Sequence, residues 1–143
     1  MANITDSSLI LLTYKSKILL KLHDSNPEIL DNPTNTVKNS WSFISCYKEK
    51  NKSFKDSILA KVEKKTGIQL KTVDFLLDIT YEEKSKHFFH ARLTDDNVNN
   101  MTRMDGITLQ FFTIKELSKL NLTPLTREFV DNNAQILDSL HQS

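Results

Sequence analysis

Residues 53–68 have the sequence SFKDSILAKVEKKTGI, which contains the best helix signal of the chain. Ser53 suits a helix N-cap, because its hydroxyl can accept a hydrogen bond from a free backbone amide of the first turn. Gly67 stands where a left-handed residue commonly ends a helix. The apolar side chains between these two ends recur at helical spacing: Phe54, Ile58, Leu59 and Val62. The stretch therefore predicts an amphipathic helix with one face on a core.

Strand patterns precede this helix. Two apolar runs at 7–14 and 17–22 predict a β-hairpin, and Trp41–Ser45 predicts a short strand. Between them, residues 23–40 are rich in Asn, Asp and Pro and predict a long loop.

Strand and helix patterns also follow it. They predict strands at 73–81, 87–93 and 106–112, a short helix over 114–119 and a C-terminal helix at about 124–140. We therefore expect one α/β (α+β) domain over residues 1–143, in which a mixed β-sheet is sandwiched between helices.

Composition excludes several classes of protein. With 38% hydrophobic and 26% charged residues, the chain has the balance of a globular domain, and no apolar run approaches the ~20 residues of a membrane span. A single cysteine, Cys46, excludes an intrachain disulfide and a multi-cysteine zinc site. The first residues do not resemble a signal peptide. We expect a cytoplasmic protein without membrane contact or disulfides.

Charge is unevenly distributed although the net charge is only +1. Between Tyr47 and Lys65 the chain has seven lysines against three acidic residues, so positive charge is concentrated around the predicted helix.

Several residues in and near this helix resemble the signature of the Nudix family, G-x5-E-x7-R-E-U-x-E-E-x-G-U, where U is a bulky aliphatic residue. Gly67 and Ile68 match its last two positions, and Val62 matches its internal aliphatic position. Trp41 lies five residues before the first motif position, and segments 110–117 and 120–124 resemble later parts of the family. The resemblance implies a Nudix-like fold and a degenerate Nudix box at 46–68.

The differences from the signature fall on its chemistry. Cys46 stands at the first glycine and Ala60 at the arginine. Lysine stands at each glutamate position of the signature: Lys52, Lys61, Lys64 and Lys65. In active members such glutamates hold magnesium, but ammonium groups cannot ligate a cation. The resemblance thus implies a protein without the catalytic metal site, with no catalytic residue, no metal and no cofactor.

One helix face is the candidate ligand site. At 100° per residue, positions 57, 61, 64 and 65 project within about 100° of one another. Ammonium groups at such positions suit a phosphate. The candidate ligand-binding residues are Lys52, Ser57, Lys61, Lys64, Lys65 and, for stacking, Phe111. The alternative is that the lysines form only a solvated helix face.

The histidines and the cysteine form no chemical site in this prediction. His87 and His90 lie at odd spacing on a predicted strand, so they should point to opposite faces and form no metal site. Cys46 has no adjacent histidine, which favours an unreactive thiol.

Three functions from different classes follow. The preferred one is a non-catalytic interaction or adaptor module that binds another protein. The first alternative is a metal-independent binder of a nucleotide or other phosphorylated ligand through the lysine patch. The second is an atypical Nudix-type pyrophosphohydrolase, with residual hydrolysis through Asp105 or Glu49.

Overall fold

The computed structural model describes residues 6–23, 40–102 and 107–141. Most of the predicted loop 23–40 and the candidate Asp105 lie outside this part of the chain. The strands are β1 (Ser7–Tyr14), β2 (Lys17–His23), β3 (Ser40–Ser42), β4 (Ile44–Tyr47), β5 (Asp74–Tyr81), β6 (Lys84–Arg92) and β7 (Thr108–Thr113). The helices are α1 (Phe54–Thr66), α2 (Asp95–Asn99), α3 (Ile114–Leu117), α4 (Pro124–Asn132) and α5 (Ala134–His141).

Helix α1 begins and ends as its sequence predicts. The Ser53 hydroxyl accepts a hydrogen bond from the Asp56 amide at 3.0 Å. Gly67 has a φ of 77° and donates its amide to the Glu63 carbonyl, which closes the last turn. The buried residues of the helix are Ser57, Ile58, Val62 and Thr66.

The described strands form one mixed sheet in the order β3-β2-β1-β6-β5. β1 and β2 form the predicted antiparallel hairpin, whereas β1 and β6 are parallel. Beyond the hairpin turn β1 and β2 separate: β1 pairs with β4, and β2 pairs with β3 on one edge and β7 on the other. The predicted strand at 41–45 is therefore two strands, because each of the separated partners needs its own pairing segment.

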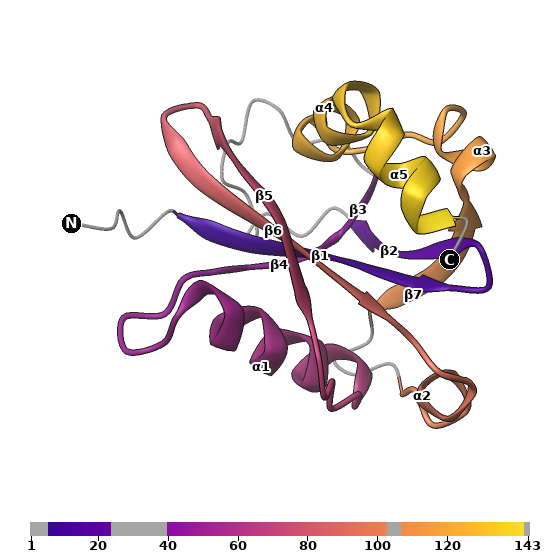
Figure 1. Cartoon of the computed structure of the whole chain (residues 1–143), viewed down its shortest axis with the longest axis horizontal. Coiled ribbons are helices and arrows are strands. Elements are labelled where there is room, and N and C mark those ends of the chain that lie inside the picture. The colour runs from indigo at the N-terminus through magenta and orange to yellow at the C-terminus, as the bar shows by residue number, and fades with distance from the viewer. Residues whose placement is uncertain (1–5, 24–39, 103–106, 142–143) are drawn as a thin grey trace.

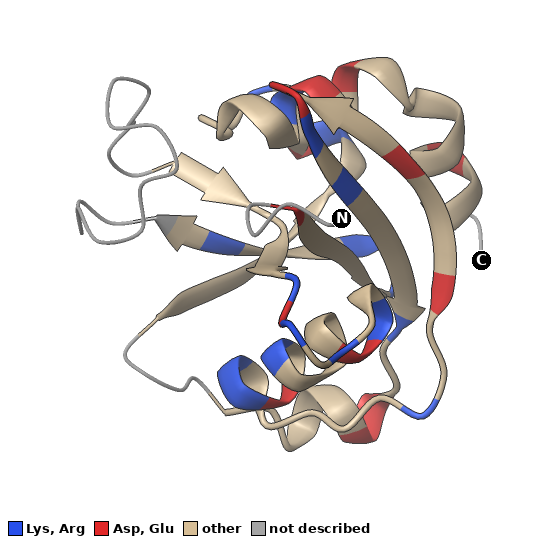
Figure 2. Cartoon of the chain, turned by 90° about the vertical axis from the view of Figure 1, so that its left-hand side faces the viewer, with Lys and Arg blue, Asp and Glu red and all other residues tan. Residues whose placement is uncertain are grey.

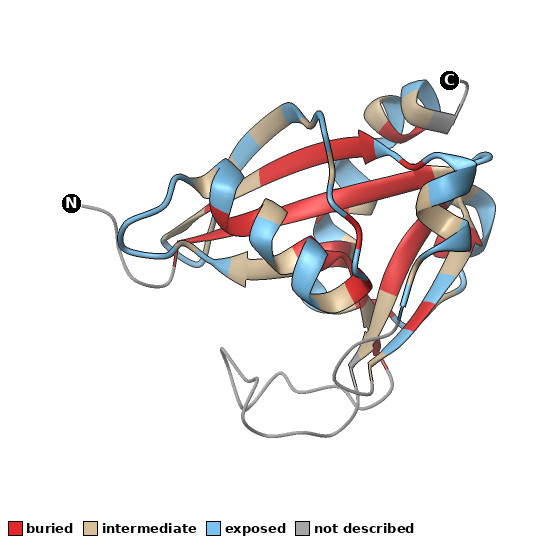
Figure 3. Ribbon diagram, turned by 90° about the horizontal axis from the view of Figure 1, so that it is seen from below, coloured by how far each residue is buried: buried red, intermediate tan, exposed pale blue. Residues whose placement is uncertain are grey.

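Helices cover both faces of this sheet (Figure 1). Below it in Figure 1, Ile58 and Val62 of α1 pack on a cluster that includes Ile10, Leu12 and Phe89. On the other face, Leu117, Phe129 and Leu137 from the last three helices pack on the second cluster, which includes Leu11, Phe43 and Phe88. Figure 3 shows the buried residues running along the central strands, with exposed residues on the outer side of α1. The expected fold class, a mixed sheet sandwiched between helices, is confirmed.

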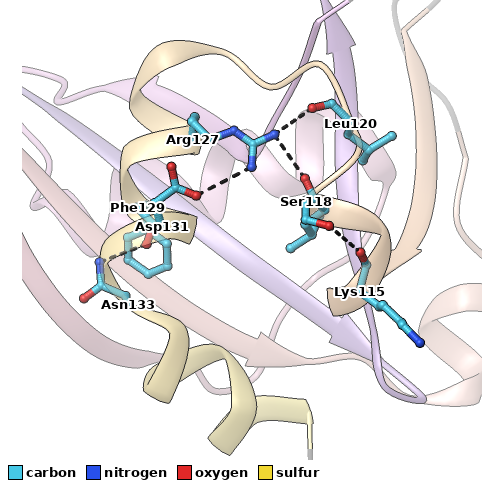
Figure 4. Close-up of polar contacts among 8 residues, drawn as sticks. Lys115, Ser118, Leu120, Arg127, Phe129, Asp131 and Asn133 are labelled. Atoms are coloured by element: carbon cyan, nitrogen blue, oxygen red, sulfur yellow. Dashed lines mark hydrogen bonds and ion pairs between the residues drawn. The ribbon is translucent and has the colours of Figure 1, made fainter.

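The C-terminal part differs from the sequence prediction in one respect. The helix expected at about 124–140 is interrupted at Asn133, which separates α4 from α5. The Asn133 side chain donates to the Phe129 carbonyl at 3.0 Å, and its own carbonyl accepts the Leu137 amide (Figure 4). An asparagine that bonds the backbone locally in this way competes with helix continuation, so the chain turns here.

Arg127 holds the preceding turn together. Its guanidinium donates from Nη2 to the carbonyls of Leu117 at 3.2 Å and Leu120 at 2.7 Å, and Nη1 lies 3.6 Å from the Asp131 carboxylate (Figure 4). The carbonyls at the end of α3 thus gain donors that the short helix itself cannot supply.

Candidate functional site

The loop before α1 is tied to the helix by polar contacts. The Lys52 ammonium lies 2.8 Å from the Glu49 carboxylate. The Glu49 amide donates to the Ser57 hydroxyl at 3.1 Å. The Lys52 ammonium, through its hydrogen bond and its charge, lowers the pKa of the Glu49 carboxyl, and Glu49 in turn raises the pKa of Lys52. Because both charged groups are exposed, the pair serves to order the loop more than to stabilise the fold.

Ser57 differs from the expectation of a side chain presented on the lysine face. It is buried at 3% exposure, and its hydroxyl accepts the Glu49 amide. The helical angle of 100° per residue places the Ser57 side chain on the same side of α1 as the lysines. It does not show what else in the protein covers that side. The loop 48–53 folds back over that direction and covers the hydroxyl.

The lysines of α1 form the exposed part of the candidate site. Lys64 is exposed, while Lys61 and Lys65 are half-buried and make further interactions of their own. Figure 2 shows the lysines of α1 and of the loop before it as blue segments on one side of the molecule. Lys61 lies close enough to Cys46 to influence its titration, and Lys64 does the same for Glu49. The helix and the loop therefore present one basic surface.

Cys46 lies under this surface on β4. Burial raises the pKa of its thiol to about 11, against the opposing influence of the Lys61 ammonium. The side chain is consequently a neutral thiol at physiological pH, as expected for an unreactive cysteine.

The residues around α1 do not fit a magnesium ion. Magnesium needs several oxygen ligands, and its carboxylate ligands must be free to converge on one point. Glu49 is engaged by Lys52, and the Glu63 carboxylate accepts a hydrogen bond from Gln69 at 2.9 Å. In the described part of the chain no group of three or more His, Cys, Asp or Glu side chains is arranged to hold a metal.

Phe111 lies on the same side of the sheet as α1 but has its own surroundings. Its ring packs against Tyr14 with centroids 5.7 Å apart, and it belongs to the half-buried rim of the core. The Tyr14 hydroxyl donates to Asp95 at 2.7 Å, which together with Lys15 lowers the pKa of that carboxyl. None of the described contacts joins Phe111 to the lysines, so its part in a ligand site stays a prediction.

The two histidines point to opposite faces of β6, as predicted. His90 is buried and its Nε2 lies 2.8 Å from the Thr13 hydroxyl; burial lowers its pKa. His87 stacks on Phe54 of α1 with ring centroids 3.7 Å apart. The histidines thus have different partners and share no site.

An aromatic cluster at the N-terminal end of α1 was not predicted from the sequence. Phe54 and His87 stack on each other, Phe75 of β5 lies 6.1 Å from His87, and the Lys48 ammonium lies 5.7 Å from the Phe54 ring. These residues come from three separate elements and a loop. No sequence pattern connects them.

Solved structures share this architecture over nearly the whole chain. A mutT/nudix family protein from Listeria innocua matches with a TM-score of 0.75 over 100% of both chains, at 14% identity. A MutT NUDIX hydrolase from Burkholderia pseudomallei matches with a TM-score of 0.69 over 90% of this chain and 97% of that one, at 14% identity. The chain has the Nudix fold.

A third solved structure of this fold contains a ligand. The NUDIX domain of Shewanella oneidensis NrtR, solved in complex with ADP ribose, matches with a TM-score of 0.69 over 96% of this chain and 90% of that one, at 10% identity. No family model matches the sequence, and no curated protein matches it either. The likeness therefore lies in the Nudix fold and not in the sequence.

No helix in the described residues is long and apolar enough to cross a membrane.

Proposed function

We propose that this Nudix-fold protein lacks the catalytic metal site of the family and acts in the cytoplasm as a non-catalytic interaction or adaptor module. The supporting observation is the outward face of α1, where Lys61, Lys64 and Lys65 stand at the positions that resemble the family's glutamates. A fold kept without its catalytic residues is available for binding another protein.

Electrostatics supports this proposal. Three lysines within about 100° on one side of α1 repel a divalent cation placed beside them, and none of their ammonium groups offers a lone pair while protonated. Replacement of one lysine would leave two positive charges in place. Loss of hydrolysis is therefore a property of the whole face and not of a single position.

Hydrolysis assays test this proposal directly. Purified protein is incubated with nucleoside diphosphate derivatives, ADP-ribose among them, in magnesium and in chelator. We expect no magnesium-dependent product. Magnesium-dependent cleavage abolished by chelator would contradict the proposal and favour the atypical pyrophosphohydrolase, with Asp105 and Glu49 as the acids to replace next.

Restoring the acids tests the assignment of the helix positions. The triple variant Lys61→Glu, Lys64→Glu and Lys65→Glu should bind magnesium more tightly than the parent, as measured by calorimetry. A variant with glutamate at Lys55, Lys115 and Lys119 carries the same change of charge on exposed positions outside this face. Equal magnesium binding by both variants would contradict the assignment.

The second candidate function is binding of a phosphorylated ligand without metal. The basic surface of α1 favours it, and the ADP ribose complex of the NrtR domain gives a first ligand to try. A ligand at ~100 times its dissociation constant adds about 2.7 kcal/mol to the unfolding free energy, which a thermal-shift screen detects. Binding should need no magnesium, weaken with salt, and be lost in Lys64→Ala/Lys65→Ala but kept in Lys119→Ala.

A further inference from the structure

Strand β5 ends the sheet and pairs with β6 alone. Among residues 6–23, 40–102 and 107–141, no backbone hydrogen bond reaches its outer edge. Figure 2 shows β5 at the right-hand rim of the sheet, with acidic segments in red along it. An edge strand of eight residues presents amide and carbonyl groups with which another extended chain can pair.

Apolar surface borders this edge on both faces of the sheet. Phe75 is 55% exposed, and its ring is held beside Phe89 at 5.7 Å on the side of α1. On the opposite side Leu77 and Ile79 are half-buried at the margin of the other cluster. A chain laid along β5 would remove part of this surface from water, which favours its docking.

The charge of this edge restricts what can bind there. Residues 74–83 contain Asp74, Asp78, Glu82 and Glu83 and no lysine or arginine. Edge strands are commonly protected by charged side chains, by proline or by a β-bulge. β5 has acidic side chains and a bulge but no lysine or proline, and acidic side chains repel another acidic strand but not a basic one. Antiparallel pairing with the β5 of a second copy would bring two acidic strands together, which is unfavourable. A basic segment is the complementary occupant.

The geometry of β5 limits the length of such pairing. A register shift between Phe75 and Leu77 interrupts the ladder with β6, and the pairing is regular from Leu77↔Phe88 to Tyr81↔Lys84. A bulge bends the strand and disturbs its outer edge as well. The regular edge available to a partner is therefore 77–81.

We propose that the edge of β5 at residues 77–81 is the docking surface for an extended basic segment of a partner protein, which adds to the sheet as a further strand. Backbone hydrogen bonds supply the attachment, and lysine or arginine side chains of the segment face Asp78 and Glu82. The inference rests on the adaptor function proposed above and gives that function an interface.

Synthetic peptides test the proposal on the full chain. The probe is a capped peptide of about eight residues in which lysine and valine alternate. One control peptide has glutamate for lysine, and a second has alternate N-methylated amides, which removes backbone donors but keeps the charge. Fluorescence anisotropy gives affinity, and amide hydrogen exchange locates the contact.

The lysine peptide should bind and slow exchange of the outward amides in 77–81 by about tenfold or more, while the two controls should bind much more weakly. Asp78→Lys should weaken binding by about fivefold. Asp138→Lys, which makes the same charge change at an exposed position of α5, should leave it unchanged.

Three results would overturn the proposal: similar affinity of the lysine and glutamate peptides, similar affinity of the N-methylated peptide, or protection on α1 and not on β5. If the amides of 77–81 exchanged more slowly at higher protein concentration without any peptide, the occupant of the edge would be a second copy of this chain and not a basic segment. Failure here leaves the absence of hydrolysis untouched, and detection of magnesium-dependent hydrolysis would overturn the adaptor function without altering the exchange data.

Discussion

At the scale of single residues, Arg127 shows how one side chain closes a turn. Replacing it with methionine keeps most of the aliphatic stem but removes the charged donor of the Leu117 and Leu120 carbonyls, so that Leu117 keeps only the long bond of 3.4 Å from the Leu120 amide. Since hydrogen bonds from a charged donor are worth about 1.5–3 kcal/mol, we expect a loss of about 2 kcal/mol in unfolding free energy, measured by urea denaturation. Arg92→Met, at an exposed position, is the matched control and should cost little. Equal losses of unfolding free energy in both variants would argue against a stabilising role of the Arg127 hydrogen bonds.

His90 makes a prediction about pH at the same scale. Burial lowers its pKa below the ordinary 6.5, so below that pH the unfolded chain takes up a proton that the folded chain does not. This contribution to stability is complete above pH 6.5 and is lost as the pH falls from there toward the folded-state pKa. Urea denaturation from pH 7.5 to 5 should show that fall, with a smaller slope in His90→Gln.

His87→Gln is the control for this experiment, because it removes a histidine that lies on the other face of the same strand. An unchanged pH dependence in His90→Gln would show that other groups cause it.

At the scale of elements, α1 depends on Gly67, the residue that caps its C-terminal end. Gly67 has a φ of 77°, and a Cβ there would lie 2.9 Å from the Thr102 hydroxyl oxygen. Gly67→Ala should therefore lower the unfolding free energy by about 1–2 kcal/mol, from backbone strain together with the close contact. Chemical denaturation measures the loss. Adding Thr102→Ala removes the close contact, so any recovery in the double variant gives the steric share; a fully tolerated Gly67→Ala would contradict the assigned geometry.

At the scale of the whole molecule, the sheet separates two clusters of apolar side chains. Phe129 stacks on Phe88 with centroids 4.3 Å apart in one cluster, and Val62 is buried in the other. Phe129→Leu and Val62→Ala should each destabilise through lost contacts. Because the two sites share no described contact, the double variant should equal the sum within about 0.5 kcal/mol in urea denaturation. A larger deviation would show that the two layers are coupled through the strands.

Much of the fold was accessible from the sequence. The caps of α1, the β1–β2 hairpin and most of the strands follow from local patterns, because helix ends and turns depend on residues close in sequence. The short helix α2 was not predicted. The lysines of α1 could also be placed from the sequence, since helical spacing alone predicts that they lie on one side of the helix. The end of α4 at Asn133 could not be predicted, because it depends on the hydrogen bond that the Asn133 side chain donates to the Phe129 carbonyl in the folded turn.

The features that depend on tertiary packing involve residues distant in sequence. Ser57 is buried because the loop 48–53 folds over it, and the predicted strand at 41–45 divides because β1 and β2 separate. Phe54, Phe75 and His87 meet only when α1, β5 and β6 pack together, and β5 becomes an edge only through the strand order. Sequence determines which side a residue takes on its own element, since that depends on a local period. Packing determines what covers that side, since the covering residues come from elsewhere in the chain.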